Sequence, residues 1–288
     1  MTGADEVFAV ERPRLLGLAY RILASYTDAE DVVQEAWIRW QRVDVERVEA
    51  PAAYLTTILT RLALDRVRTL ARRREHYVGP WLPEPIAVER GPEENAEMAE
   101  SLTLGFLMVL DRLNPTERAV WLLAEVFGEP YALIASVTGK TEAACRQIAT
   151  RARRHLREER PAPPERLDAG VLRRLLAAVA AGDLDQTLEL LDADVVLVSD
   201  AGPDRRAARQ PVVGADRVAR FAINVARRGE MTGLRETTVN GSAALVIEID
   251  GALPLVVAGE QRDGRVSKIF LLLNEEKLRA LSSHPNIT

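Results

Sequence analysis

The sequence predicts a multidomain protein in which two all-α domains precede an α+β domain. The chain has 288 residues, roughly twice the ~150 expected for one domain. Apolar residues recur at helical spacing up to about residue 159, whereas short β-rich runs appear only after about residue 195. Two polar, proline-rich stretches, 79–92 and 161–166, interrupt the periodic segments and are interpreted as linkers.

Three helices are expected in the first domain. Apolar residues repeat at helical spacing from Leu15 to Leu23 and again from Val32 to Trp40. A third helix is expected from about Pro51, because proline suits the first turn of a helix, and its leucines form a buried face.

The second of these helices carries an exposed acidic face. Asp31, Gln34 and Glu35 fall on the side opposite the apolar stripe that contains Trp37 and Trp40. Taken alone, this pattern favours an ordinary solvated surface over a docking site.

The third helix carries a basic ridge. Arg61, Asp65, Arg68 and Arg72 recur at steps of four, three and four, and Arg73 and Arg74 follow, which suits contacts with phosphates. An aromatic and three hydroxyl side chains near the start of the helix form a mixture that could hold unstacked bases. These residues are Tyr54, Thr56, Thr57 and Thr60.

A helix-turn-helix is expected from Tyr131 to Leu156. A short helix from Tyr131 to Val137 leads into a turn at Gly139, and Thr141 is a good N-cap for a second helix. Cys145 falls on the inner stripe of that helix, so it is expected to pack in the core. Base edges would be read from the start of the outer face and phosphates held further along it. The outer residues are Thr141, Glu142, Ala143, Arg146, Gln147, Thr150, Arg153, Arg154 and Arg157.

The third domain is expected to be α+β. Two helices, 169–181 and 184–191, precede β-rich runs at 195–199, 243–249, 253–258 and 266–273. Asp200 and Asp250 fall at strand ends with no visible partner, and His284 lies in a tail beyond Ser282 that is expected to be loose. The sequence therefore offers little for acid–base chemistry here.

Composition limits the function further. The net charge of −5 argues against a protein that coats nucleic acid, although basic and acidic segments alternate along the first 165 residues. The single cysteine excludes an internal disulfide, and three widely separated histidines give no metal-ligand spacing. No metal, cofactor or membrane segment is expected, and the default location is the cytoplasm.

The motifs together resemble a known family. The helix beginning DAEDVVQEAW at Asp28, the helix AAYLTTILTRLALDRVR from Ala52 and the helix-turn-helix segment from Pro115 resemble bacterial extracytoplasmic-function (ECF) sigma factors, which have only regions two and four. The linker motif Trp81-Leu82-Pro83-Glu84-Pro85 and the α+β extension resemble the subgroup with a polyketide cyclase-like (SnoaL-like), cone-shaped C-terminal domain. A C-terminal Asn-Pro-Asp-Lys motif is typical of that subgroup, and here the corresponding residues are Asn274-Glu275-Glu276-Lys277.

The resemblance implies a division of labour. The acidic face, extended to Asp28, would dock on the clamp helices of core RNA polymerase, and residues 41–50 would capture a flipped base of the minus-10 promoter element. Tyr54, Thr57, Arg61, Asp65 and Arg68 would hold the strand of that element, and the helix-turn-helix would face the minus-35 duplex. The expected domains are region two (1–76), a linker (77–98), region four (99–160), a second linker (161–166) and the SnoaL-like domain (167–288).

The third domain is expected to regulate rather than to catalyse, since a fold does not carry an activity with it. It would pack on the helical domains or on the linker, through Trp81 to Pro85, Asn274 and Lys277, and bias a two-state equilibrium. A passive appendage remains the alternative for this domain. For the whole protein, the alternatives are a one-component helix-turn-helix regulator with a ligand-sensing domain and a cyclase- or isomerase-type enzyme with a helical accessory domain.

Overall fold

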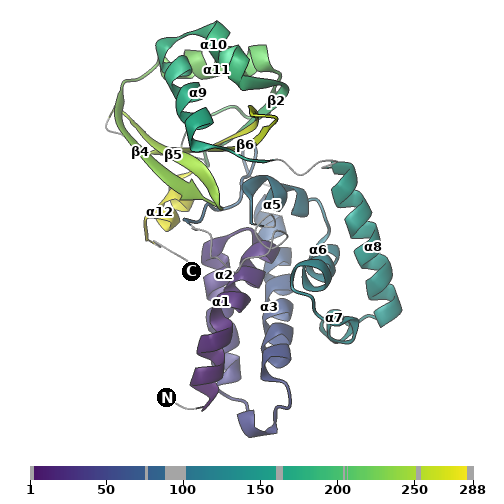
Figure 1. Cartoon of the computed structure of the whole chain (residues 1–288). Coiled ribbons are helices and arrows are strands. Elements are labelled where there is room, and N and C mark those ends of the chain that lie inside the picture. The colour runs from purple at the N-terminus through teal and green to yellow at the C-terminus, as the bar shows by residue number, and fades with distance from the viewer. Residues whose placement is uncertain are drawn as a thin grey trace.

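The structure is a computed structural model of the whole chain, and it describes residues 3–74, 77–87, 102–159, 165–203, 205, 207–250 and 254–283. Two helical units lie together at one end of the molecule, and a helix-covered sheet lies at the other (Figure 1). The expected order of two all-α domains followed by an α+β domain is confirmed.

The first unit is a bundle of three helices. Ser25 caps the second helix by accepting a hydrogen bond from the Asp28 backbone, which stabilises its first turn. Trp40 is fully buried, and its indole Nε1 donates to the Ala4 carbonyl. The helices are α1 (Gly3–Leu23), α2 (Tyr26–Trp40) and α3 (Pro51–Arg74), with a short 3-10 turn, η1 (Val45–Arg47), before α3.

The second unit is built from shorter helices. Asn114 and Glu117 form a capping box at the start of the helix that begins at Pro115. A π-helical segment, η2, continues that helix. The elements are α5 (Leu104–Leu110), α6 (Pro115–Trp121), η2 (Leu122–Val126), α7 (Tyr131–Thr138) and α8 (Glu142–Glu159).

The two helical units share one hydrophobic core. Buried side chains from α1 to α3, such as Leu18 and Leu59, belong to the same cluster as Leu110, Leu123 and Ile148 of the second unit. Because apolar burial drives association, separating the units would expose part of this core to water.

The C-terminal domain is a mixed sheet with three helices on one face and the last helix of the chain on the other (Figure 1). The strand order is β3-β2-β7-β6-β5-β4, with β2 and β7 parallel, the other neighbours antiparallel, and β1 paired with β6. The helices are α9 (Ala169–Ala181), α10 (Leu184–Leu190), α11 (Ala215–Ala226) and α12 (Glu275–Ser283). The strands are β1 (Glu165–Arg166), β2 (Leu191–Asp200), β3 (Val212–Val213), β4 (Met231–Val239), β5 (Ser242–Ile249), β6 (Leu255–Arg262) and β7 (Arg265–Leu272).

Alternate residues of the strands face two different cores. On β5, Leu245 and Ile247 pack beneath α9 and α11, whereas Ala244 and Val246 face the opposite side. The opposite side also buries Leu82 of the linker and Leu104 of α5. One face of the sheet thus closes the domain, and the other contacts the rest of the chain.

Some elements differ from those predicted. Helix α11 and strands β1, β3 and β4 were not foreseen, and residues 165–166, expected in a linker, pair with β6. Strand β4 was not predicted because it lies at the edge of the sheet. There the exposed Arg235 and Glu236 interrupt the alternation of apolar and polar residues that marks a half-buried strand. The linker residues 88–98 and the tail from His284 onward lie outside the described residues.

Candidate functional site

The acidic face predicted on α2 is exposed. Asp31, Gln34 and Glu35 are exposed, and Asp28 is half-buried at the start of the helix. Arg66 of α3 pairs with Asp28 at 2.5 Å and with Asp31 at 3.3 Å, so α3 fixes the first of these carboxylates in place. Glu35 pairs with Arg39 one turn later. The face therefore presents two carboxylates and an amide from a rigid helix.

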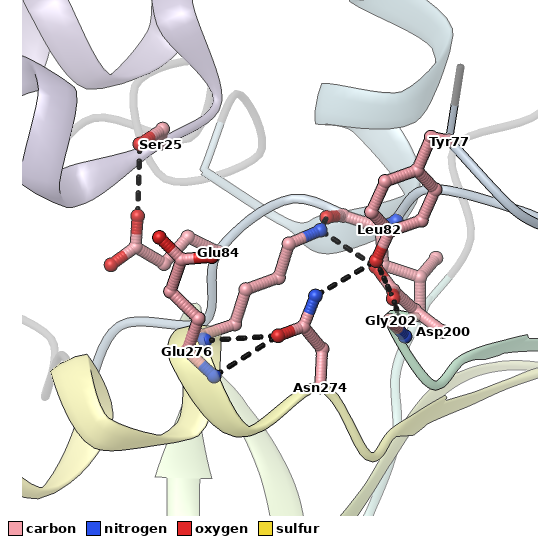
Figure 2. Close-up of polar contacts among 9 residues, drawn as sticks. Ser25, Tyr77, Leu82, Glu84, Asp200, Gly202, Asn274 and Glu276 are labelled. Atoms are coloured by element: carbon pink, nitrogen blue, oxygen red, sulfur yellow. Dashed lines mark hydrogen bonds and ion pairs between the residues drawn. The ribbon is translucent and has the colours of Figure 1, made fainter. Parts of the chain in front are cut away.

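Glu84 of the linker holds the N-terminus of this helix. Its carboxylate accepts hydrogen bonds from Ser25 Oγ at 2.9 Å, Thr27 Oγ1 at 2.8 Å and the Thr27 backbone N–H at 3.2 Å (Figure 2 shows Ser25). A negative charge here also interacts favourably with the positive end of the helix dipole. The linker thus stabilises the helix that carries the acidic face.

The residues predicted on α3 are split by burial. Tyr54, Arg61, Asp65 and Arg68 are exposed and Thr57 is half-buried, so these five side chains can reach a ligand. Thr56 and Thr60 are fully buried, and Thr56 Oγ1 accepts a hydrogen bond from Arg14. The interpretation of these two threonines as base-contacting groups was therefore wrong, because they lie on the core side of the helix. The side chains of Arg72 to Arg74 lie outside the described residues.

The second helical unit packs across this surface. Arg61 Nη2 donates to the Ser136 carbonyl of α7 at 2.7 Å. Nearby, Arg14 pairs with Glu129, and Arg118 Nη1 donates to the Ile22 carbonyl at 2.8 Å. A residue predicted to hold DNA is thus engaged by the neighbouring domain.

The helix-turn-helix has the predicted geometry. Gly139 adopts φ 68°, a left-handed conformation that glycine tolerates best, and Thr141 Oγ1 accepts from the Ala144 backbone as the expected cap. Cys145 is fully buried, in agreement with a packing role. The outer residues Thr141, Glu142, Ala143, Arg146, Gln147 and Thr150 are all exposed.

Two arginines of α8 differ in how far they are available to DNA. Arg146 pairs with Glu142 at 2.7 Å and lies over the Tyr131 ring, and both contacts leave its guanidinium at the surface. Arg153 is half-buried and pairs with Glu125 of η2 at 2.5 Å, so it also ties α8 to its own domain.

A buried polar cluster joins the linker to the C-terminal domain (Figure 2). The Asp200 carboxylate is fully buried at the end of β2, and one of its oxygens lies 2.6 Å from Lys277 Nζ and accepts from the Leu82 backbone N–H at 2.8 Å. The other oxygen accepts from the Tyr77 hydroxyl and from the Gly202 N–H. The prediction that Asp200 has no partner was wrong, because Tyr77, Leu82 and Lys277 lie far from it in the sequence.

Lys277 is the second centre of the same cluster. Its ammonium also donates to the Leu82 carbonyl and lies 4.0 Å from the centre of the Trp81 ring. Asn274 caps α12 through its side-chain oxygen, and its Nδ2 donates to Tyr77 at 2.8 Å. Burial, together with the bond to Asp200, raises the pKa of the Tyr77 phenol well above its ordinary value. The cluster therefore has a neutral phenol beside one compensated ion pair.

The linker motif is buried from Leu82 onward, and Trp81 is half-buried. Residues 82–86 are all buried, including Pro83 and Pro85, and Leu82 is fully buried. Both backbone polar groups of Leu82 are satisfied by one ion pair. The Leu82 N–H donates to Asp200, and the Leu82 C=O accepts from Lys277.

Asn240 forms a second junction, which the sequence prediction missed. It lies at the tip of the β4–β5 hairpin with φ 51° and is 1% exposed. Its Nδ2 donates to the Tyr20 hydroxyl and to the Leu102 carbonyl, each at 2.7 Å, and its backbone and side chain exchange two hydrogen bonds with Ile86. The Asn240-Gly241 pair is a strong hairpin signal and could have revealed the turn, but not its long-range partners.

The described candidate residues form no recognisable catalytic site. Asp250, expected to have no partner, accepts from the Glu230 backbone N–H at 2.7 Å and thereby closes a turn. Within the described ranges, no group of three or more His, Cys, Asp or Glu side chains could hold a metal ion. No described helix is long and apolar enough to cross a membrane.

Comparison with known families agrees with the geometry. Residues 7–73 match the family described as Sigma-70 region 2, and residues 104–156 match the one described as Sigma-70, region 4. The three-helix bundle and the helix-turn-helix thus define a sigma-70-type transcription initiation factor.

Two relatives narrow the class. The chain is 37% identical to the ECF RNA polymerase sigma factor SigJ of Mycobacterium tuberculosis, over 94% of this chain and 91% of the relative. It is 34% identical to a probable ECF RNA polymerase sigma factor, SigI, of the same species, over 94% and 93%. The chain belongs to the extracytoplasmic-function RNA polymerase sigma factors. It is a sigma factor and not an enzyme, and the alternative of a one-component regulator is not favoured.

One solved structure is similar over nearly the full length of the chain. The crystal structure of SigJ superposes with a TM-score of 0.76 at 33% identity, covering 96% of this chain and 98% of that one. The likeness includes the C-terminal α+β domain and extends well beyond regions two and four.

Proposed function

We propose that the C-terminal domain of this sigma factor holds regions two and four in a closed arrangement and releases them for promoter binding. The observation that carries the proposal is the pairing of Lys277 with both Asp200 and the Leu82 carbonyl. This pairing fixes the linker between the two helical domains to the third domain. A domain that grips the linker can control how far apart those domains lie.

Core RNA polymerase would dock on the exposed face of α2. Asp28, Asp31, Gln34 and Glu35 would contact the clamp helices of the largest subunits. The support is that three of them are exposed on one face, while Arg66 and Glu84 hold the start of the helix. This role places the protein in the cytoplasm, where polymerase and promoter DNA are found.

The promoter would be bound by two helices. The minus-10 strand would lie along α3 at Tyr54, Thr57, Arg61, Asp65 and Arg68, with residues 41–50 around a flipped base. The minus-35 duplex would meet α8 at Thr141, Glu142, Ala143, Arg146, Gln147, Thr150 and Arg153. The functional units proposed are 1–76, 77–98, 99–160, 161–166 and 167–288, as expected from the sequence.

The closed arrangement would compete with promoter binding. Arg61 donates to the Ser136 carbonyl, so the minus-10 strand and α7 would share one surface. Two weakly binding modules gain affinity when their spacing is fixed, because the second contact forms at a high effective concentration. Polymerase would fix that spacing only after the domains separate, which is a two-state equilibrium that the C-terminal domain biases.

Run-off transcription with core polymerase tests the proposal. The full chain, a chain ending before Arg166 and the full-length variant Lys277→Met are compared on the same promoters. We expect both altered proteins to change the transcript yield by severalfold relative to the full chain. Equal yields from all three proteins would leave the C-terminal domain a passive appendage.

Binding measurements separate the sigma function from its regulation. The full chain should join core polymerase and should bind promoter DNA poorly without it. Failure to join polymerase would contradict the docking surface, whereas normal joining with unchanged transcription would contradict only the regulatory role.

A further inference from the structure

The C-terminal domain contains a partly open apolar cavity that the sigma function does not use. The cavity has a volume of about 320 Å³ and lies between the sheet and the helices α9 and α11. Leu197, Leu245 and Ile269 line it from the strands, and Leu172 and Phe221 line it from the helices. No ionisable, amide or hydroxyl side chain is among its lining residues.

A void of this size is unusual in a packed domain. Protein interiors are filled to the density of organic crystals, and voids larger than a water molecule are few. Water is not expected to bind stably in this cavity. A buried water molecule needs two or more polar partners, and the side chains that line the cavity supply none. An apolar cavity of about 150 Å³ already takes up benzene, so this one has room for roughly twelve carbon atoms.

The cavity opens at one end of the domain. Met231 is 45% exposed and Ala180 is also exposed, so the mouth lies where the end of α9 meets the start of β4. Leu197 and Leu245, which also line the cavity, are 1% and 2% exposed. The volume of the cavity and its apolar lining suit a small molecule, whereas a protein partner needs a broad exposed face.

We propose that this cavity binds a small lipophilic molecule whose hydrocarbon body of about twelve carbons lies among the leucine and isoleucine side chains. Binding is without chemical change, since the lining offers no acid, base or nucleophile. The cavity and the contacts with the linker lie on opposite faces of the same strands, as Leu245 and Ala244 illustrate.

Two tryptophan variants on α9 make a matched test. Ala180 lines the mouth, and Ala177, also exposed, lies one turn earlier and does not line the cavity. Ala180→Trp should block the cavity, and Ala177→Trp adds the same ring to the surface outside it. The full chain and both variants are titrated with naphthalene by equilibrium dialysis, with 1-decanol as a competitor.

We expect the unaltered chain and Ala177→Trp to bind about one equivalent of naphthalene that 1-decanol displaces. Ala180→Trp should weaken that binding by at least tenfold. Circular dichroism checks that both variants fold, and 1-decanol should raise the melting temperature of the unaltered chain and Ala177→Trp but not of Ala180→Trp.

Three results would overturn the proposal. They are an absence of saturable naphthalene binding, equal binding by both variants, and a dimer of the unaltered chain that Ala180→Trp dissociates. The last result would assign the cavity mouth to a second copy of the chain. None of these measurements involves polymerase, so the outcome is independent of the proposed regulation.

Discussion

Asn240 Nδ2 lies 2.7 Å from the hydroxyl of Tyr20, a residue 220 positions earlier in the chain. The same hydroxyl donates to the Glu84 carbonyl, also at 2.7 Å. One buried amide of the C-terminal domain is thereby linked to region two, and through Tyr20 to the linker. Burial raises the pKa of the Tyr20 phenol well above its ordinary value, which keeps the hydroxyl protonated as a donor.

Replacing Asn240 by aspartate should weaken the junction. Aspartate tolerates the same left-handed backbone but replaces the Nδ2 donor by an oxygen, which would face the Leu102 carbonyl. We expect the free energy of unfolding, measured with urea, to fall by about 2 kcal/mol. The reason is that the buried Tyr20 hydroxyl and Leu102 carbonyl lose the amide that donates to them.

The hairpin turn at Asp263-Gly264 supplies a control for this change. Asp263 has φ 50° and is exposed, so Asp263→Asn exchanges the same two side chains in a similar turn without buried partners. Its effect should stay within about 0.5 kcal/mol. Equal effects of the two substitutions would contradict the importance of the Asn240 contacts.

Removing the charge of Lys277 should loosen the linker. Lys277→Met leaves the buried Asp200 carboxylate without its counter-ion, which typically costs about 3 to 5 kcal/mol. The Leu82 N–H donates to the same carboxylate, so its hydrogen exchange, measured by NMR, should accelerate. The control is Arg279→Met on the exposed side of α12, which should leave that exchange rate unchanged. Slow exchange of the Leu82 N–H in Lys277→Met would contradict the idea that Lys277 holds the linker.

Charge reversal on α2 should abolish polymerase binding without unfolding the protein. The double variant Asp31→Arg and Glu35→Arg changes two exposed residues, so the helix content should stay the same by circular dichroism. We expect the affinity for core polymerase, measured by fluorescence anisotropy, to fall at least tenfold. Glu6→Arg, an exposed reversal on α1, is the control, and retained binding in the double variant would count against the docking face.

The sequence predicted local features well and long-range pairings poorly. The outward set on α8, the cap at Thr141 and the core position of Cys145 all follow from helical periodicity and are present in the structure. The partners of Asp200 and Asn240 could not be predicted in this way, because they are brought together only when domains pack. Even on a well-predicted helix, Thr56 and Thr60 are buried. Thr56 contacts Arg14 of α1, a tertiary contact that the periodicity of a single helix does not reveal.

Recognition of the minus-35 element should depend on two arginines of α8 in different ways. Arg146 lies on the first turns of the helix, beside Gln147, where side chains reach base edges in the major groove. Arg154 lies two turns later and its side chain is 73% exposed, a position that suits a phosphate. Arg146→Ala in the holoenzyme should cost about 1 to 3 kcal/mol of promoter affinity and relax the preference at one base pair.

Arg154→Ala should instead weaken binding to every sequence alike and reduce the salt dependence of log K by about one unit. Both effects can be measured by titrating holoenzyme with promoters that vary at each minus-35 position, at two or more salt concentrations. If Arg146→Ala lowered affinity for all sequences equally, α8 would be holding the DNA backbone there rather than reading bases. In that case the remaining exposed candidates for readout would be Thr141, Glu142, Ala143, Gln147 and Thr150.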